Sequence, residues 1–204
     1  DQLYIKSMSR KNNNEIKKTK DNILAKGLSL FEAKGYNATG IQEIADAAEI
    51  PKGSFYNYFS SKEDFGVAVI NFYTEKHLLE WTTRINSNSQ DNEKLIQVFL
   101  DITKDYDCSE SQKGCLLGNL AAEISAASDK CRNALAVAIK SFKEVLIERI
   151  ITGQANGEFT TAIAPERIAD LIWNNWQGSL LELKVKKSIE PLQNNLQTLF
   201  NCLS

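Results

Sequence analysis

Residues 39–59 read TGIQEIADAAEIPKGSFYNYF, and this stretch decides the fold of the first part of the chain. Apolar residues recur in it at every third or fourth position, which predicts a helix over residues 41–49 and a second helix over residues 54–59. Pro51 and Gly53 interrupt the pattern between the two helices. Two short helices around such a tight connection predict a helix-turn-helix.

The second helix of this motif combines an apolar side with an unusually polar one. Phe55 and Phe59 are four residues apart, so both can be buried against Ile44 and against the first helix around Leu28 and Phe31. The hydroxyls and the amide near the open side belong to Ser54, Tyr56, Asn57 and Tyr58. Because a helix in the major groove of DNA needs such groups for phosphates and base edges, the pattern favours DNA binding.

Three neighbouring residues agree with this interpretation. Gly53 has no Cβ and permits close approach of a phosphate at the helix start. Thr39 can cap the first motif helix and also donate to a phosphate. Ser60 and Glu63 have the spacing of a capping box, which places Lys62 in the first turn of the next helix, where a cation opposes the dipole. A phosphate contact explains this lysine, and a solvated lysine is the alternative.

Composition bounds the class of protein. The chain has 204 residues, of which 43% are hydrophobic and 25% are charged, as in an ordinary globular protein. Because no apolar run reaches the roughly 18 residues that span a bilayer and no apolar signal core is found, we expect a soluble, cytoplasmic protein without membrane contact. The four cysteines are far apart, so we expect reduced thiols rather than a disulfide framework.

Charge is distributed unevenly along the chain. Residues 1–62 contain 10 Lys and Arg against 7 Asp and Glu, a net charge of +3, whereas residues 63–204 have a net charge of −5. The first third is therefore the candidate for a polyanionic partner, although so small an excess also fits a solvated surface.

The sequence as a whole predicts an all-α fold, because helical spacing recurs almost throughout and strand-like alternation is missing. About nine helices are expected, over residues 19–34, 41–49, 54–59, 62–85, 93–106, 115–127, 130–152, 165–185 and 189–203. We expect three regions. These are a disordered tag remnant and basic arm over residues 1–17 with Met8 as the native start, a DNA-binding domain over residues 18–62, and an effector-binding and dimerisation domain over residues 63–204.

Residues 19–65 resemble the DNA-binding domain of the TetR family of transcriptional regulators. The resemblance is carried by Phe31, Gly35, Thr39, Ile44, Ala45, Ala48, Ile50, the run KGSFYNYF at residues 52–59, and Ser61, Lys62 and Glu63. It implies an all-α homodimer that binds double-stranded operator DNA, usually as a repressor, and that responds to a small-molecule effector.

The resemblance also implies a role for individual residues. Four residues would face or approach base edges, namely Gln42, Lys52, Ser54 and Asn57. Four others would hold phosphates, namely Thr39, Tyr56, Tyr58 and Lys62. Asn57 stands where many relatives have His or Trp, and its amide suits adenine, so the operator sequence does not follow from the resemblance.

The segment KGCLLGNLAAE at residues 113–123 resembles the NemR-type subgroup of the family, in which a cysteine at the position of Cys115 senses reactive electrophiles. Cys115 follows Gly114 at a predicted helix start, where the dipole favours a thiolate. A small buried hydrophobe is the competing interpretation, because related regulators without thiol chemistry share the segment. Cys108 and Cys131 could resolve an oxidised Cys115 only within about 6–7 Å between Cα atoms.

The resemblance further implies an effector pocket and a dimer interface in the C-terminal domain. The candidate pocket residues besides Cys115 are Phe99, Tyr106, Asn119, Trp173, Trp176 and Gln177, with plain core packing as the alternative for the aromatic residues. A partner helix could approach closely at Gly178, Leu180, Leu181 and Leu183, so we expect a homodimer through the last two helices.

Two other classes of function compete with a DNA-binding regulator. A small helical enzyme is disfavoured because the only histidine, His77, lies in a helix without a nucleophile pattern, so we assign no catalytic residue. Metal, redox-pair and nucleotide motifs are missing from the sequence, so we expect no metal and no cofactor. A helix-turn-helix module that binds protein instead of DNA predicts no salt-dependent DNA affinity.

Overall fold

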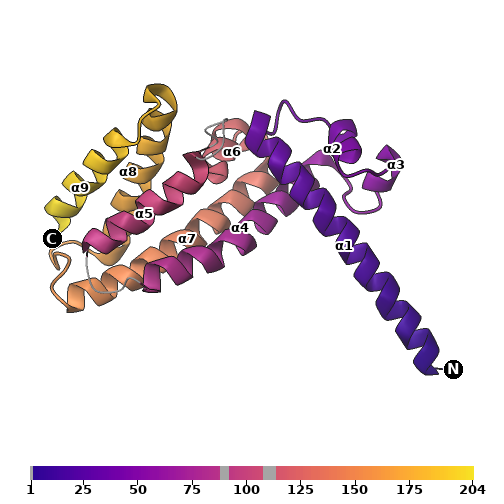
Figure 1. Ribbon diagram of the computed structural model, residues 1–204, viewed down its shortest axis with the longest axis horizontal. Coiled ribbons are helices and arrows are strands. Elements are labelled where there is room, and N and C mark those ends of the chain that lie inside the picture. The colour runs from indigo at the N-terminus through magenta and orange to yellow at the C-terminus, as the bar shows by residue number, and fades with distance from the viewer. Residues whose placement is uncertain (1, 88–91, 108–113) are drawn as a thin grey trace. The chain divides into compact units, whose positions relative to one another are not determined.

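The computed structural model describes residues 2–87, 92–107 and 114–204, and these residues form an all-α protein, as expected. Nine helices occur in these ranges, and each overlaps one of the expected segments. The helices are α1 (Gln2–Lys34), α2 (Ile41–Ala47), α3 (Lys52–Phe55), α4 (Lys62–Ser87), α5 (Asn92–Asp107), α6 (Leu116–Ile124), α7 (Asp129–Ala155), α8 (Pro165–Lys186) and α9 (Glu190–Leu203) (Figure 1). Within the described ranges, no helix is long and apolar enough to cross a membrane.

Helices α1 and α3 differ most from the expected ranges. α1 begins at Gln2, so residues 2–17, which we expected to be a tag remnant and a disordered arm, are helical in the structure. No proline or glycine interrupts this stretch, and its lysines are good helix formers. α3 ends at Phe55 because the next backbone bonds have the tighter i→i−3 spacing, with Asn57 N donating to Ser54 O over 3.1 Å.

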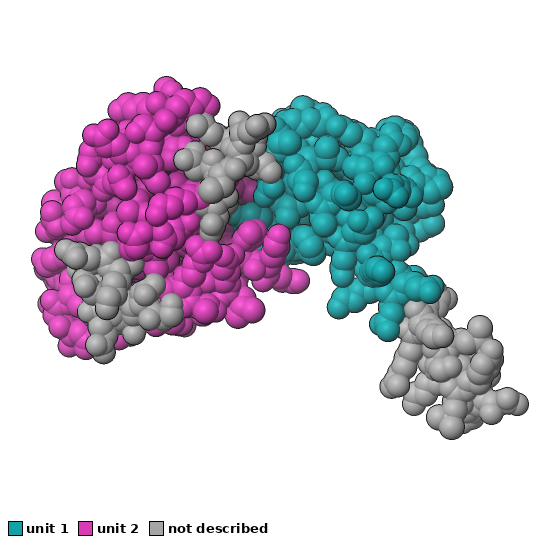
Figure 2. Space-filling model, viewed as in Figure 1, with its two compact units in different colours: residues 1–73, 123–134 teal, residues 74–122, 135–204 magenta. Residues whose placement is uncertain are grey.

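The chain forms two compact units (Figure 2). Unit 1 comprises residues 1–73 and 123–134, and unit 2 comprises residues 74–122 and 135–204. Unit 1 therefore contains the expected DNA-binding domain and also takes in the first part of α4, the end of α6 and the first turns of α7. The chain passes between the units inside these three helices.

Four phenylalanine rings form the core of unit 1. The ring centroid of Phe65, in α4, lies 5.8 Å from that of Phe31, 5.3 Å from that of Phe55 and 4.9 Å from that of Phe59. None of the four side chains is more than 4% exposed, and Ile44 of α2 is fully buried. The expected burial of Phe55 and Phe59 is thus confirmed.

The start of α4 is capped one residue later than the sequence predicted. The Ser61 hydroxyl oxygen accepts a hydrogen bond from Asp64 N over 3.0 Å, so Ser61 and not Ser60 caps the helix. The Ser60 hydroxyl bonds to the Asp64 carboxylate instead. The expected capping box of Ser60 and Glu63 is therefore wrong, although Lys62 does lie in the first turn of α4.

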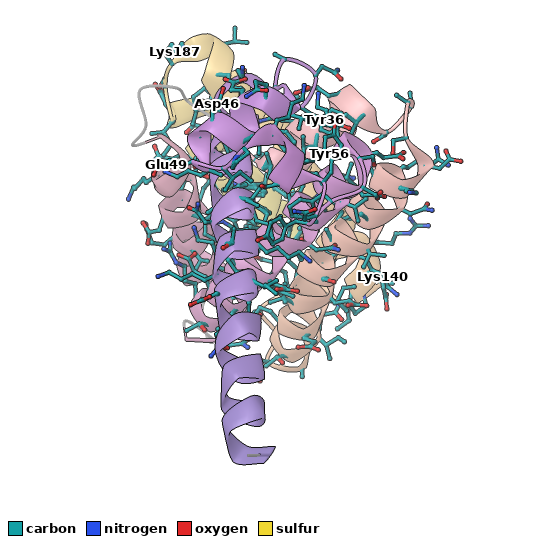
Figure 3. The ribbon with its side chains drawn as sticks, turned by 90° about the vertical axis from the view of Figure 1, so that its right-hand side faces the viewer. Tyr36, Asp46, Glu49, Tyr56, Lys140 and Lys187 are labelled. Carbon is teal, nitrogen blue, oxygen red and sulfur yellow. The ribbon has the colours of Figure 1, made fainter. Side chains whose placement is uncertain are left out.

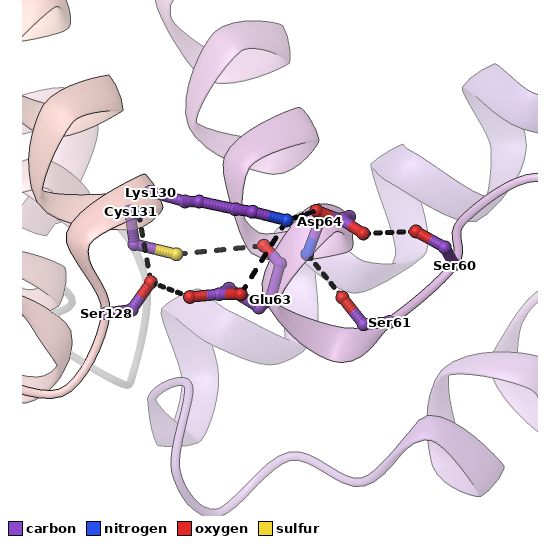
Figure 4. A network of polar contacts seen from close by, with 7 residues as sticks. All are labelled: Ser60, Ser61, Glu63, Asp64, Ser128, Lys130 and Cys131. Carbon is purple, nitrogen blue, oxygen red and sulfur yellow. Dashed lines mark hydrogen bonds and ion pairs between the residues drawn. The ribbon is translucent and has the colours of Figure 1, made fainter.

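Polar contacts tie the first turn of α7 to the first turn of α4 within unit 1 (Figure 4). Lys130 Nζ lies 2.7 Å from Asp64 Oδ1, and the Ser128 hydroxyl bonds to the Glu63 carboxylate. The hydrogen bonds that Asp64 accepts, first of all from Lys130, lower its pKa to about 2. The Cys131 thiol is buried beneath this network and donates to the Glu63 carbonyl over 3.7 Å. Burial raises the pKa of Cys131, so this thiol behaves as a packing residue of unit 1.

Unit 2 is built around a second aromatic cluster. The ring centroid of Trp81, in α4, lies within 5.9 Å of four other centroids, those of Phe99, Phe142, Trp173 and Trp176. These rings come from α5, α7 and α8, so the cluster joins four helices. α9 packs on α8 and α5 (Figure 1).

A buried ion pair also belongs to unit 2. The Arg149 side chain is 2% exposed and pairs with the Glu158 carboxylate, which is 13% exposed. The Arg149 Cζ atom lies 5.9 Å from the centroid of the Phe159 ring. Among the described residues, Nε and Nη1 of Arg149 have no hydrogen-bond partner. The buried guanidinium therefore depends on Glu158 for compensation of its charge.

We expect Glu158→Gln to lower the free energy of unfolding by about 3–5 kcal/mol, because it leaves a buried cation without its counter-ion. Urea denaturation followed by circular dichroism measures the change. The matched control is Glu144→Gln, which breaks the pair of Lys140 and Glu144, whose side chains are 77% and 55% exposed. The control should lose at most about 1 kcal/mol. Equal losses in both variants would contradict the assignment of Arg149 as a charge that only Glu158 compensates.

Candidate functional site

Backbone hydrogen bonds fix the turn between α2 and α3. Ile50 N donates to Ala45 O over 3.0 Å, as in a Schellman motif, and Glu49 has the left-handed φ of 58° that this motif requires. The Asn22 amide of α1 donates to Ala48 O over 3.1 Å and so ties the turn to the first helix. The two motif helices are therefore held at a fixed geometry by the backbone and by α1.

The residues predicted to contact DNA surround this turn with different degrees of exposure. Five are exposed, namely Gln42, Lys52, Gly53, Tyr56 and Asn57, and three are half-buried, namely Ser54, Tyr58 and Lys62. The Tyr56 side chain is 50% exposed. In the view of Figure 3, Tyr56 and Tyr36 lie on one side of unit 1, and the acidic residues Asp46 and Glu49 lie on the other. The polar side of α3 and of its following turn is thus accessible.

Thr39 and Gln42 are already engaged inside unit 1. Thr39 is 1% exposed and its hydroxyl donates to Gly35 O over 2.7 Å. Gly40 occupies the N-cap of α2, so the expected capping role of Thr39 is wrong, because its hydroxyl turns back to the end of α1. Gln42 Nε2 donates to Asp46 Oδ1 over 2.8 Å.

Tyr36 positions Lys62, and the sequence reasoning missed it. The Lys62 ammonium lies 4.3 Å from the centroid of the Tyr36 ring, a cation–π contact. Burial lowers the pKa of Lys62 and raises the pKa of Tyr36 to about 12. The only signal in the sequence was an aromatic residue directly after Gly35. The contact holds the lysine charge at the start of α4.

Glycines in unit 1 differ in why they are needed. Gly35 has a φ of 82°, and an ideal Cβ there would lie 2.3 Å from Glu123 Oε1, so the fold itself requires this glycine. At Gly53 an ideal Cβ meets nothing within 4 Å. Packing within the described residues therefore does not account for Gly53, whereas close approach of another molecule would.

Unit 2 contains a cavity of about 260 Å³ between α6, α7 and α8. Four residues of the predicted effector site line it, namely Cys115, Asn119, Trp173 and Gln177. The other lining residues are Gly118, Ala122, Ile139, Gly178, Leu180, Leu181 and Lys184. The structure thus brings together residues from two distant parts of the sequence into one site.

Two predicted effector residues do not line this cavity. Phe99 and Trp176 are fully buried in the aromatic cluster around Trp81. Trp176 Nε1 also donates to the Thr103 hydroxyl over 3.0 Å, which fixes the ring in the core. Neither ring lines this cavity, so a role for them at the effector site stays a prediction. The Tyr106 side chain and Cys108 lie outside the described residues.

Cys115 lies at the start of α6, as predicted. Its carbonyl accepts a hydrogen bond from Asn119 N over 3.1 Å, and the preceding Gly114 has a φ of 64°. The thiol is free and its residue is 5% exposed. Cys115 therefore combines a helix start with a place on the cavity wall.

Lys184 is the cavity residue that the sequence reasoning overlooked. Its Nζ donates to Asn119 Oδ1 over 2.7 Å. The available signal was spacing, because Trp173, Gln177, Leu180 and Lys184 follow one another at intervals of four, three and four residues on α8. One face of α8 therefore lines the cavity along three turns.

An exposed apolar strip of α8 borders the cavity, and Leu181 belongs to both. Leu181 is 62% exposed and Val185 is 82% exposed. Leu180 and Leu183, which we expected to face a partner, are 3% and 4% exposed because they pack within the protomer. On α9 the large apolar residues are buried, Leu196 among them.

Comparison with known proteins gives matches over both parts of the chain. The family model described as "Bacterial regulatory proteins, tetR family" matches residues 23–69, and "Tetracyclin repressor-like, C-terminal domain" matches residues 93–199. The HTH-type transcriptional repressor DhaR of Mycobacterium sp. is 33% identical over 185 residues, which are 90% of this chain and 91% of DhaR.

The HTH-type transcriptional repressor NemR of Escherichia coli is 30% identical over 187 residues, which are 91% of this chain and 94% of NemR. The crystal structure of reduced Escherichia coli NemR has a TM-score of 0.82 at 29% identity and covers 92% of this chain and 98% of that chain. These relatives are transcriptional regulators and not enzymes. The chain, with its buried aromatic anchor beneath a polar helix-turn-helix, belongs to the TetR family of bacterial regulatory proteins.

Proposed function

We propose that this protein is an effector-responsive repressor that binds a palindromic operator through α2, α3 and the start of α4. One observation carries the proposal: Tyr56 and Asn57 are exposed directly beside Phe55 and Phe59, which are 0% and 4% exposed. Such an arrangement presents hydrogen-bonding groups on a rigid apolar anchor, as a helix that enters the major groove must. The relatives named as transcriptional repressors support the same function.

Each residue has a proposed part in this contact. Lys52, Ser54 and Asn57 would approach base edges, with the Asn57 amide suited to adenine. Tyr56, Tyr58 and Lys62 would bond phosphates, and Gly53 would leave room for the DNA backbone. Gln42 would reach a base only by exchanging its bond to Asp46. Thr39 would act indirectly, because its hydroxyl proton is used by Gly35.

We expect Lys62→Ala to weaken binding to a specific operator and to an unrelated duplex alike. Loss of one phosphate contact should reduce the slope of log affinity against log salt by about 0.9. Fluorescence anisotropy with a duplex from upstream of the protein's own gene, titrated at several salt concentrations, measures both quantities. Salt-independent or absent DNA binding by the wild type would instead favour a protein-binding module.

The matched control is Lys140→Ala, because Lys140 lies on α7 in unit 2, is 77% exposed at its side chain and carries the same charge. It should leave the affinity and the slope unchanged. An effect of Lys140→Ala as large as that of Lys62→Ala would show that net charge, and not a contact at the start of α4, is responsible. Thermal melts verify that both variants fold.

The exposed apolar strip of α8 is the proposed dimer interface. Leu171, Gly178 and Val185 recur at seven-residue intervals, and Leu181 lies beside them. An ideal Cβ at Gly178 meets nothing within 4 Å, so a second helix can approach closely there. With α9, the two copies of α8 would form a four-helix bundle, in agreement with the dimers of this family.

We expect the double variant Leu181→Glu, Val185→Glu to be a folded monomer, because two charges on each side would lie in a desolvated interface. Light scattering coupled to size exclusion gives the mass. Leu79→Glu is the control, since Leu79 is a 74% exposed leucine on α4 and should have no effect on the mass. A dimeric double variant would place the interface elsewhere. Leu196 is unsuitable for this test because it is buried within the protomer.

The cavity of unit 2 is the proposed effector site. Cys115 lines it, so an electrophile could modify the thiol there, and a reversible ligand could instead fill the space beside it. Either event would favour an arrangement of α6 in which the protein does not bind DNA. A preference of a few kcal/mol would be enough to empty most of the operator.

Treatment with N-ethylmaleimide separates the two modes. The test uses a Cys108→Ser, Cys202→Ser protein, because this variant lacks the exposed Cys202 thiol. We expect it to lose operator affinity when Cys115 is alkylated. The same protein with Cys115→Ser should keep its affinity after treatment. If it loses affinity as readily, the thiol is not the sensor and the reversible-ligand mode stands.

A further inference from the structure

Lys184 presents a half-buried cation to the cavity of unit 2, and none of the described residues gives it a carboxylate partner. Its one recorded acceptor is the neutral Asn119 Oδ1, at 2.7 Å. No aspartate or glutamate among the described residues lies within ion-pair distance of it, whereas Lys186, one half-turn further along α8, pairs with Glu182 at 2.6 Å. Burial lowers the pKa of Lys184, which is the response of an ammonium group that lacks a counter-ion.

The end of the Lys184 side chain lies close to the backbone of Gly114. An ideal Cβ at Gly114 would lie 2.5 Å from Lys184 Cε and 3.0 Å from Nζ. The end of the side chain is therefore packed against the backbone at the start of α6. Its Nζ bonds to Asn119, and both residues line the cavity with Cys115.

Gln177 adds a donor that has no acceptor among the described residues. Its Nε2 atom is buried and has no hydrogen-bond partner among the described residues. Its Oε1 atom lies against α6, where an ideal Cβ at Gly118 would be only 2.6 Å away. Gln177 and Lys184 are seven residues apart on α8, so they share one helix face, and both line the cavity. A buried amide nitrogen left unpaired destabilises the protein, and an acceptor in the cavity would remove that penalty.

The remaining wall is apolar and the space is small. Trp173, Leu180 and Ile139 contribute large hydrophobic surfaces, and the cavity volume is about 260 Å³. This is below the range of roughly 300–1,000 Å³ that is typical of pockets for drug-sized ligands. A multiply charged phosphate would find too few donors there, whereas a single carboxylate needs no more than these two.

We propose that the cavity of unit 2 binds a small organic carboxylate, whose oxygen atoms accept hydrogen bonds from Lys184 Nζ and Gln177 Nε2 and whose short apolar part packs on Trp173 and Leu180. This inference rests on the proposed function, since it names the chemical class of the effector. It requires a negative charge on the ligand, whereas thiol chemistry at Cys115 does not require one.

Isothermal titration calorimetry of the full-length protein without DNA tests the proposal. The probes are sodium butyrate and sodium benzoate, each paired with its uncharged amide, butyramide or benzamide. We expect at least one carboxylate to bind at least tenfold more tightly than its amide, a difference of about 1.4 kcal/mol or more. Equal affinities within both pairs, or no carboxylate binding, would overturn the proposal.

Two variants locate the charge recognition. Lys184→Met keeps the length of the side chain and should weaken carboxylate binding at least tenfold while leaving amide binding unchanged. Lys186→Met, the matched control on the same helix, should behave like the wild type. Gln177→Glu supplies a carboxylate to Lys184 from the protein itself, so it should raise the melting temperature and abolish carboxylate binding. A Gln177→Glu protein that binds carboxylate as the wild type does would overturn the proposal.

The same experiments separate this inference from the function on which it rests. Carboxylate binding that needs Lys184 supports the inference even if operator affinity does not change, and that result would count against the effector role of the cavity. Release of the operator by N-ethylmaleimide without any carboxylate binding would leave the repressor function standing and overturn the inference.

Discussion

The contact between Phe55 and Phe65 is the interaction on which the DNA-facing part of the protein depends. α3 has only four residues, far too few for a helix that is stable alone, so tertiary contacts must hold it. Phe55 supplies them by inserting fully into the core, where its ring centroid lies 5.3 Å from that of Phe65. α1 makes room for Phe65 through Gly27, where an ideal Cβ would lie 2.2 Å from the ring. α1, α3 and α4 thus meet at the Phe65 ring. Burial of a phenylalanine side chain contributes about 1.5–3 kcal/mol to the stability of the fold.

α6 provides a continuous path between the cavity and the helix-turn-helix. Its first turns carry the cavity residues Gly118 and Asn119, and its last two residues belong to unit 1. There, Glu123 Oε2 accepts a hydrogen bond from Asn37 N over 3.0 Å, in the loop that leads into α2. α6 is a single helix of nine residues, so its cavity-lining start and Glu123 belong to one element. Under the proposed effector role of the cavity, α6 and this hydrogen bond would connect the effector to the loop that leads into α2.

Helical periodicity was sufficient to predict all nine helices and the apolar side of the motif, because the spacing of Phe55 and Phe59 directly reflects which face is buried. It failed where tertiary contacts compete for a polar group. The hydroxyl of Thr39 could have capped α2 or turned back to Gly35. The sequence pattern is compatible with both hydrogen bonds and does not decide between them. It also did not predict that Phe99 and Trp176 lie in the aromatic core, since aromatic residues at helical spacing look the same in a core and on a cavity wall.

Lys184 shows most clearly why the site could not be read from the sequence. Lys184 and Lys186 both stand in the last turn of α8, where a cation complements the helix dipole, so both have an ordinary explanation. The packing of α6 against α8 separates them, because it half-buries Lys184 beside Asn119 and leaves Lys186 exposed with Glu182. A hydrophobic side chain of similar length would fill the same space without the desolvation penalty of a charge. The proposed carboxylate would supply the counter-charge that Lys184 lacks among the described residues.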